Sequence, residues 1–93
     1  LMLDPAARQV TVGGVPVHLT RTEYALCHLL LQNPGRVLSK SAILERISRD
    51  TPDCTEGSLK THISNLRGKL WDATGKDHIE AVWGIGFRLR PES

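Results

Sequence analysis

The chain has 93 residues, which suits one domain over residues 1–93, and its composition (40% hydrophobic, 24% charged) is ordinary for a globular protein. No apolar run approaches the roughly 18 residues that cross a bilayer, which argues against a membrane-spanning helix. Cys27 and Cys54 lack a metal-binding or redox spacing, so we expect reduced thiols in a cytoplasmic protein, with a disulfide as the less favoured alternative.

Positive charge is concentrated in the C-terminal third. The net charge is +2, but residues 1–56 hold six basic and six acidic side chains, whereas residues 57–90 hold six basic and three acidic ones. This third is therefore the part that would attract a polyanion such as nucleic acid. A solvated basic surface without a partner fits the charge equally well. The positions of the charges must therefore distinguish nucleic-acid binding from a solvated surface.

The N-terminal segment predicts an antiparallel sheet. Residues 8–12 and 15–19 each alternate apolar and polar side chains, and Gly13-Gly14 joins them as in a β-hairpin. Pro16 has no N–H to donate, so its strand should lie at a sheet edge. Residues 1–3 are expected to add a third strand.

Two short helices are expected next. Thr20 and Glu23 form a capping box that begins the first, and Asn-Pro-Gly at 33–35 ends it. After an extended segment at 36–38, Ser39 caps the second helix. The predicted core faces are Tyr24, Leu26, Cys27, Leu30 and Leu31 in the first helix, and Ile43, Leu44 and Ile47 in the second.

A longer third helix, residues 58–73, has two contrasting faces. Leucine and isoleucine recur at helical spacing on one narrow stripe, and Gly75 ends the helix. The stripe consists of Leu59, Ile63, Leu66 and Leu70, and the opposite face carries small or short polar residues, namely Gly57, Thr61, Ser64, Asn65, Gly68 and Asp72.

The short side chains of that face favour binding in the DNA major groove. They let the helix approach base edges, where Thr61 could contact a thymine methyl and Asn65 could pair with adenine. A solvated outer face is the alternative, although such faces usually carry long Glu and Lys residues. Residues at the two flanks would reach phosphates: Lys60 and Arg67 on one side, Ser58 and Lys69 on the other.

The C-terminal segment predicts a second hairpin. Residues 78–83 and 87–90 alternate around Gly84-Ile85-Gly86, which puts Arg88 and Arg90 on one face. An arginine on such a wing could enter a narrow minor groove, and a solvent-facing arginine is the alternative. For Trp83 we expect either packing on the core or contact with the DNA backbone.

Other functional classes find little support in the sequence. The carboxylates lack an obvious pairing and no nucleophile motif is present, so we expect no enzyme and no small-molecule substrate. The histidines lack metal-ligand spacing, and the glycines near 84 lack the dinucleotide fingerprint, so we expect no metal and no cofactor. His62 lies beside the apolar stripe, where we expect a partly buried, hydrogen-bonded ring or, alternatively, a DNA contact.

Five segments together resemble the OmpR/PhoB-type winged-helix domains, the DNA-binding effector half of response regulators in two-component phosphorelay signal transduction. The resemblance implies an α+β winged helix-turn-helix: an N-terminal antiparallel sheet, three helices and a C-terminal β-hairpin wing. It also implies transcription regulation through promoter DNA, bound by dimers on tandem half-sites. The matching segments are residues 3–5 (LDP), 19–24 (LTRTEY), 33–39 (NPGRVLS), 61–67 (THISNLR) and 82–89 (VWGIGFRL).

The resemblance also implies roles for individual positions. The connection between the second and third helices, residues 49–55, would touch RNA polymerase through Arg49, Asp50 and Asp53. DNA contacts are implied at Ser58, Thr61, His62, Ser64, Asn65 and Arg67, and at Arg88 in the wing, residues 84–88. Many members have Arg or Lys at positions 64 and 65 and Arg at position 83, so a different base sequence and one phosphate contact fewer are expected here.

The family's receiver domain is absent from this sequence. We therefore expect residues 1–93 to be the C-terminal effector fragment of a longer protein that begins with a receiver or another domain. The competing functional hypothesis is a winged helix that acts as a protein-interaction scaffold without binding DNA. A scaffold would be expected to expose apolar residues on the third helix, and the polar set there argues against it.

Overall fold

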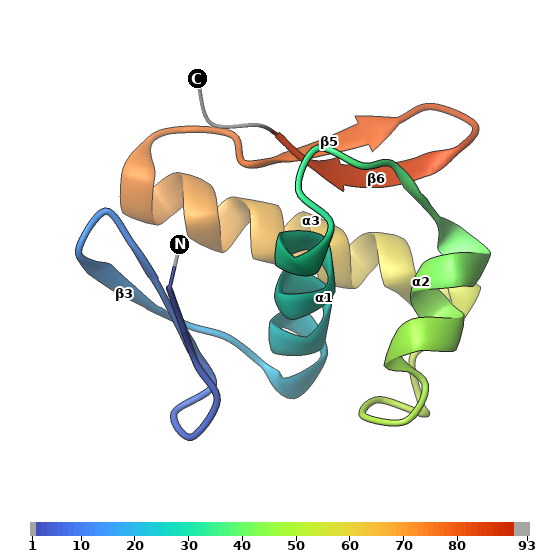
Figure 1. The fold of residues 1–93 in the computed structure, drawn as a ribbon, viewed down its shortest axis with the longest axis horizontal. Helices are drawn as coiled ribbons and strands as arrows, with labels where there is room; N and C mark the ends of the chain where they lie inside the picture. The colour runs from blue at the N-terminus through green and yellow to red at the C-terminus, as the bar shows by residue number, and fades with distance from the viewer. Residues whose placement is uncertain (1, 91–93) are drawn as a thin grey trace.

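Two three-stranded antiparallel sheets flank three helices in the computed structural model, which describes residues 2–90 (Figure 1). The order along the chain is β1 (Met2–Asp4), β2 (Gln9–Val12), β3 (Val15–His18), α1 (Arg21–Gln32), β4 (Leu38–Ser39), α2 (Lys40–Ile47), α3 (Glu56–Thr74), β5 (Ile79–Val82) and β6 (Gly86–Leu89). Figure 1 shows the first sheet at the lower left, the second along the top, and α3 crossing the molecule behind α1. The predicted α+β winged-helix fold is confirmed.

The first sheet has the order β1-β2-β3 and confirms the predicted hairpin. Val10 lies opposite Val17, and both are buried because alternate residues of each strand face the helices. Pro16 lies in the edge strand and is exposed, as its missing N–H requires. The expected third strand is β1. Leu1, which we placed in it, lies outside the described residues.

Helix α1 begins as predicted, and its buried face contains Leu26, Cys27 and Leu30 of the predicted face. The Thr20 hydroxyl accepts from the Glu23 N–H, and the Glu23 carboxylate accepts from the Thr20 N–H. The buried face includes Leu29 and Glu23, whereas Tyr24 and Leu31, which we placed in the core, are only half-buried. The buried face is thus shifted toward Glu23, whose carboxylate contacts Lys69 of α3, as described below.

Helix α2 begins at the predicted cap, where the Ser39 hydroxyl accepts from the Ala42 N–H. Ile43 and Ile47 are buried and Leu44 is half-buried. The connection to α3 is anchored by Thr51, which is buried and donates its hydroxyl to the Ile47 carbonyl.

Helix α3 begins two residues earlier than the predicted start. Its N-cap is Thr55, whose hydroxyl accepts from the Ser58 N–H while the Ser58 hydroxyl accepts from the Thr55 N–H. Serine thus takes the place that glutamate usually has in a capping box, which is why the start was missed. The predicted stripe of Leu59, Ile63, Leu66 and Leu70 is fully buried, and Gly75 ends the helix with φ +70°.

The second sheet has the order β4-β6-β5, so the two-residue strand β4 joins the wing hairpin to the start of α2. Phe87 and Leu89 point into the core from β6, and Ile79 does so from β5. Trp83 is 96% exposed, which removes the alternative that it packs on the core. Ala81 is also exposed, so Ile79 is the only residue of β5 that is buried in the core.

The buried residues of both sheets and all three helices form one hydrophobic cluster. In residues 2–90, the part that is described, no helix has the length and apolar character needed to cross a membrane. Both cysteines are free thiols. Burial raises the pKa of the Cys27 thiol to about 12, and Cys54 is half-buried at the end of the α2–α3 connection.

Candidate nucleic-acid interface

Apart from Trp71, the outer face of α3 consists of exposed small and polar residues. It lies opposite the buried stripe because the two sets alternate at helical spacing. A Cβ atom built at Gly68 meets nothing within 4 Å, so packing within the chain does not require glycine there. The predicted set of Gly57, Thr61, Ser64, Asn65, Gly68 and Asp72 is exposed, and Trp71 on the same side of the helix is 54% exposed as well.

Lysine and arginine flank this face, but in different states. Lys60 is exposed. Arg67 is half-buried and donates from Nη2 to Asp77 Oδ2 at 2.9 Å. Lys69, which we expected to reach phosphate, donates from Nζ to Oε1 of Glu23. Arg67 and Lys69 therefore each contact a carboxylate, whereas Lys60 forms no ion pair within the described residues.

The Lys69–Glu23 pair is a contact between α3 and the start of α1. The Glu23 side chain is 2% exposed, and the same Oε1 atom also accepts from the Thr20 N–H at 2.9 Å. A buried carboxylate is costly unless it is paired and hydrogen-bonded. Lys69, whose side chain is 39% exposed, supplies the charge that makes this burial tolerable.

Two further predicted contact residues lie at the rim of the exposed face. The Ser58 hydroxyl is engaged at the helix start, where it serves the Thr55 N–H. His62 is half-buried, as expected beside the stripe, but it makes no hydrogen bond within the described part of the chain, which differs from the hydrogen-bonded ring we expected. Its imidazole is therefore not committed to a polar contact within residues 2–90.

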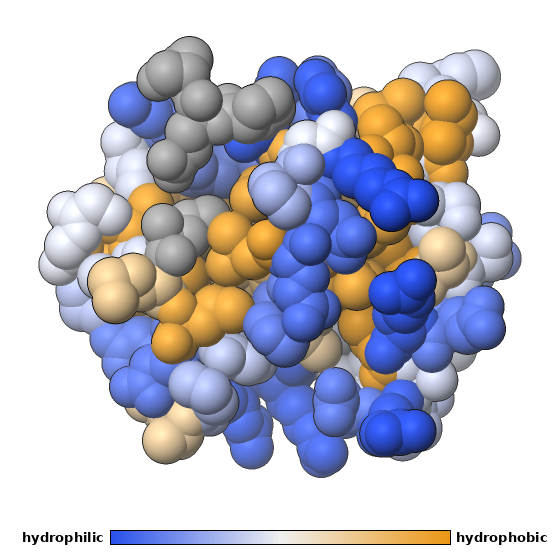
Figure 2. All heavy atoms as spheres, in the orientation of Figure 1, coloured by the Kyte–Doolittle hydropathy of each residue, from blue (hydrophilic) through white to orange (hydrophobic). Residues whose placement is uncertain are grey.

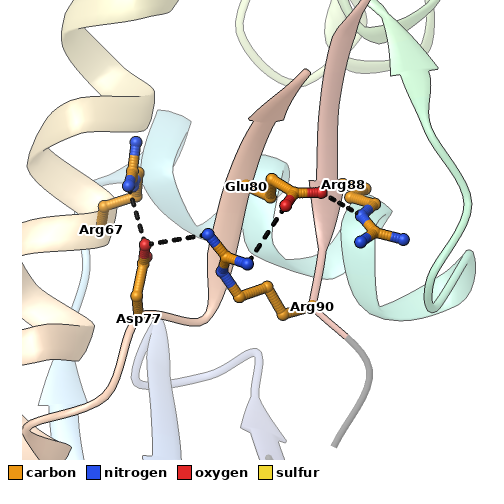
Figure 3. Close-up of polar contacts among 5 residues, drawn as sticks. All are labelled: Arg67, Asp77, Glu80, Arg88 and Arg90. Carbon is orange, nitrogen blue, oxygen red and sulfur yellow. Dashed lines mark hydrogen bonds and ion pairs between the residues drawn. The ribbon is translucent and has the colours of Figure 1, made fainter.

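Charged side chains of the wing continue from α3 in an alternating series, which we call the charge chain (Figure 3). Asp77 accepts from Arg67 and lies 3.5 Å from Nη2 of Arg90, and Nη1 of Arg90 donates to Glu80 at 3.1 Å. The other Glu80 oxygen accepts from Nε of Arg88. The charge chain is thus Arg67, Asp77, Arg90, Glu80 and Arg88, and it connects α3 to β6.

The charge chain stabilises the ionised form of Asp77. Partial burial alone would raise the pKa of this carboxyl group, but the hydrogen bond and charge of Arg67, the Ile79 N–H and the charge of Arg90 together lower it. Asp77 is therefore a carboxylate at neutral pH, and its contacts with both arginines persist there.

Two apolar side chains stand out at the wing tip. Trp83 is 96% exposed and Ile85 is 59% exposed, on either side of Gly84. In Figure 2 apolar residues gather at the upper right, where Figure 1 places the β5–β6 turn. The predicted turn is present and leaves these two side chains in contact with solvent.

The predicted polymerase-contact loop lies apart from the wing. Arg49, Asp50 and Asp53 are exposed, and the buried Thr51 holds the connection against α2. Figure 1 shows this connection at the lower right and the β5–β6 turn at the upper right. The structure therefore keeps the loop residues together but does not bring them to the wing.

The sequence patterns did not predict the ion pairs of three carboxylates. Glu23 pairs with Lys69, and Asp77 and Glu80 pair with arginines. Glu80 could have been found by counting, because a hairpin that turns at 83–85 places residue 80 opposite residue 88. Glu23 offered no such signal, because its partner is 46 positions away in the sequence. No group of metal-ligating side chains occurs among residues 2–90.

The chain is similar in sequence to known transcriptional regulatory proteins. The sequence profile of the family described as "Transcriptional regulatory protein, C terminal" matches residues 14–89. The chain is 39% identical over 89 residues to the transcriptional regulatory protein QseB of Escherichia coli O157:H7, covering 96% of this chain and 39% of that relative. It is 41% identical over 91 residues to the response regulator MprA of Mycolicibacterium vanbaalenii, again spanning 39% of the relative's length.

Solved structures show the same fold. The C-terminal domain of the nisin resistance regulator NsrR superposes with a TM-score of 0.86 at 25% identity, covering 99% of this chain and 93% of that one. The DNA-binding domain of Klebsiella pneumoniae RstA, solved in complex with the RstA box, superposes with a TM-score of 0.77 at 30% identity, covering 97% of this chain and 90% of that one.

Proposed function

The chain belongs to the family of transcriptional regulatory protein C-terminal domains, the OmpR/PhoB-type winged helices, and we propose that it reads promoter DNA with α3 in the major groove and the wing at the minor groove. The observation that carries this proposal is the outer face of α3, which is exposed and, apart from Trp71, made of small and short polar residues between flanking cations. Binding by the related RstA domain to its box supports the same use of the fold here.

The proposal divides the candidate residues into readers and anchors. Short side chains on the outer face meet base edges, and long cations at its margins meet phosphates. Readers are Thr61, Ser64 and Asn65; anchors are Lys60, Arg67, Lys69 and Arg88; Ser58 and His62 contact the backbone from the rim. In the full-length protein, two copies bind tandem half-sites.

Duplex binding with a strong salt dependence is the first expected result. With about five phosphate contacts, the slope of log K against log salt concentration should be about −4.5. Fluorescence anisotropy of the 93-residue chain on a duplex selected from a random library measures it. A slope near zero would contradict the proposal, and preferential binding of a protein partner without DNA affinity would favour the scaffold function instead.

Asn65→Ala tests base reading. Asn65 is exposed on the outer face, where its amide can make two hydrogen bonds to one base. The substitution should cost about 1–2 kcal/mol on the selected duplex and little on a shuffled one. The matched control is Lys60→Ala on the same helix, which should weaken both duplexes similarly and flatten the salt slope by about one unit. Equal losses on both duplexes for Asn65→Ala would show that it does not read bases.

We also propose that the 49–55 loop contacts RNA polymerase. Because Asp50 and Asp53 are exposed and lie apart from the wing, replacing both with alanine should leave DNA affinity within about threefold, through the screened long-range field alone. Transcription in vitro from a promoter with the selected site should change, whereas the control Glu45→Ala on α2 should leave it unchanged. A large loss of DNA affinity in the folded double variant would place the loop in the DNA interface.

A further inference from the structure

Each carboxylate of the charge chain contacts two arginines. Asp77 lies between Arg67 of α3 and Arg90, and Glu80 lies between Arg90 and Arg88 of β6. Arg90 bridges the two carboxylates, so the series is continuous from the recognition helix to the wing (Figure 3). Side chains as well as backbone therefore fix the wing relative to α3.

The geometry at Arg88 leaves part of its guanidinium ready for another partner. The β5–β6 register places Glu80 directly opposite Arg88, so both side chains leave the same face of the hairpin. Glu80 accepts from Nε, and Figure 3 shows the two terminal nitrogens directed away from Glu80. Within residues 2–90 no acceptor contacts these nitrogens, and a pair of parallel N–H groups matches the oxygens of a phosphate.

The charge balance of the series works against indiscriminate binding. Three arginines and two carboxylates leave a net charge of +1, so DNA is attracted less strongly than it would be by three unpaired arginines. An arginine held in one orientation also loses less side-chain entropy when it meets a phosphate in the matching position. A held arginine adapts less well when the helix sits out of register.

We propose that Asp77 and Glu80 are positioning residues for DNA binding, which orient Arg67 and Arg88. They lower the affinity for unmatched DNA more than the affinity for the matched site. This inference rests on the proposed function. The carboxylates need not touch DNA; they act through the arginines that they hold.

Variants of Glu80 separate its charge from its geometry. Glu80→Gln keeps an oxygen that can accept from Nε of Arg88 but removes the charge, and Glu80→Ala removes both. The matched control is Glu45→Gln, an exposed carboxylate on α2 that forms no ion pair within the described residues. Affinity is measured by anisotropy on the selected duplex and on a shuffled duplex at several salt concentrations.

The expected results differ between the variants. Glu80→Ala should raise affinity for the shuffled duplex about threefold or more and steepen its salt slope by about 0.9, because Arg88 is no longer neutralised by Glu80 and its full charge acts on phosphate. Affinity for the selected duplex should rise by no more than about 1.5-fold, so the ratio of the selected to the shuffled affinity falls about twofold or more. Glu80→Gln should steepen the slope similarly with a smaller fall in the ratio, and Asp77→Asn should act through Arg67 in the same direction.

Thermal unfolding of each variant separates positioning from stability. If Glu80→Ala lowers the midpoint but moves the ratio and the slope no more than Glu45→Gln does, the carboxylates only stabilise the fold and the inference is wrong. If Glu80→Ala does not fold, the slope of Glu80→Gln against that of Glu45→Gln decides the inference. If the wild-type chain binds neither duplex, the proposed function fails and this inference fails with it.

Discussion

Gly86→Ala is expected to destabilise the fold by about 3 kcal/mol or more. A Cβ atom at this position would lie 1.9 Å from the Leu38 carbonyl oxygen, 2.7 Å from its carbon and 2.9 Å from Cα of Ser39. All three are backbone atoms, so no side-chain rotation relieves the clash. β4 cannot retreat without losing its pairing with β6, which joins Leu38 to Phe87 and Ser39 to Gly86.

Gly84→Ala is the matched control, two residues away in the same hairpin. Gly84 has φ +77° and nothing within 4 Å of an added Cβ, so alanine there costs only the strain of a left-handed conformation, about 1–2 kcal/mol. Urea unfolding followed by circular dichroism compares the two variants. If Gly86→Ala were no less stable than Gly84→Ala, the close approach of β4 would not constrain the wing.

Lys69→Ala should lower the free energy of unfolding by about 2–3 kcal/mol, since it leaves the buried Glu23 carboxylate without its charged partner. The loss should stay below that of a fully buried pair because the Lys69 side chain is 39% exposed and water can approach. Lys60→Ala is the control from the exposed side of the same helix, and its effect should stay within about 0.5 kcal/mol.

A second substitution identifies the cause of the Lys69 effect. In a Glu23→Gln background no buried charge remains, so Lys69→Ala should cost much less than in the wild type. An undiminished cost would mean that Lys69 stabilises the fold through packing of its stem. If Lys69→Ala leaves stability unchanged and weakens DNA binding as much as Lys60→Ala, then Lys69 acts only as an anchor and does not stabilise the buried Glu23 carboxylate.

Local signals in the sequence predicted most of the framework. The caps at Thr20 and Ser39, the helix ends at residues 33–35 and at Gly75, and the α3 stripe all depend on residues within a few positions of one another, and the structure contains them all. The outer face of α3 was found by the same periodicity, because the residues opposite a buried stripe must be exposed.

Contacts between distant segments were harder to predict. Glu23 was interpreted only as a capping residue, because nothing near it in the sequence reveals Lys69. Gly86 was placed in the turn with Gly84, whereas it is needed for the approach of the two-residue strand β4, which is too short to show any alternation. The sequence predicts free cations at Lys69 and Arg88, because it shows which carboxylates are present but not which of them lie beside these two residues in the fold.

The two thiols differ in burial, so their rates of alkylation can be compared to measure how often the core opens. Cys27 is buried and its pKa is about 12, so at pH 8 almost none of it is thiolate, and alkylation must wait for the helix pack to open. Cys54 is half-buried at the end of a loop and should be modified without such opening. The rate of labelling at Cys27 relative to Cys54 therefore reports how often the core opens, in the wild type and in variants that disturb the wing.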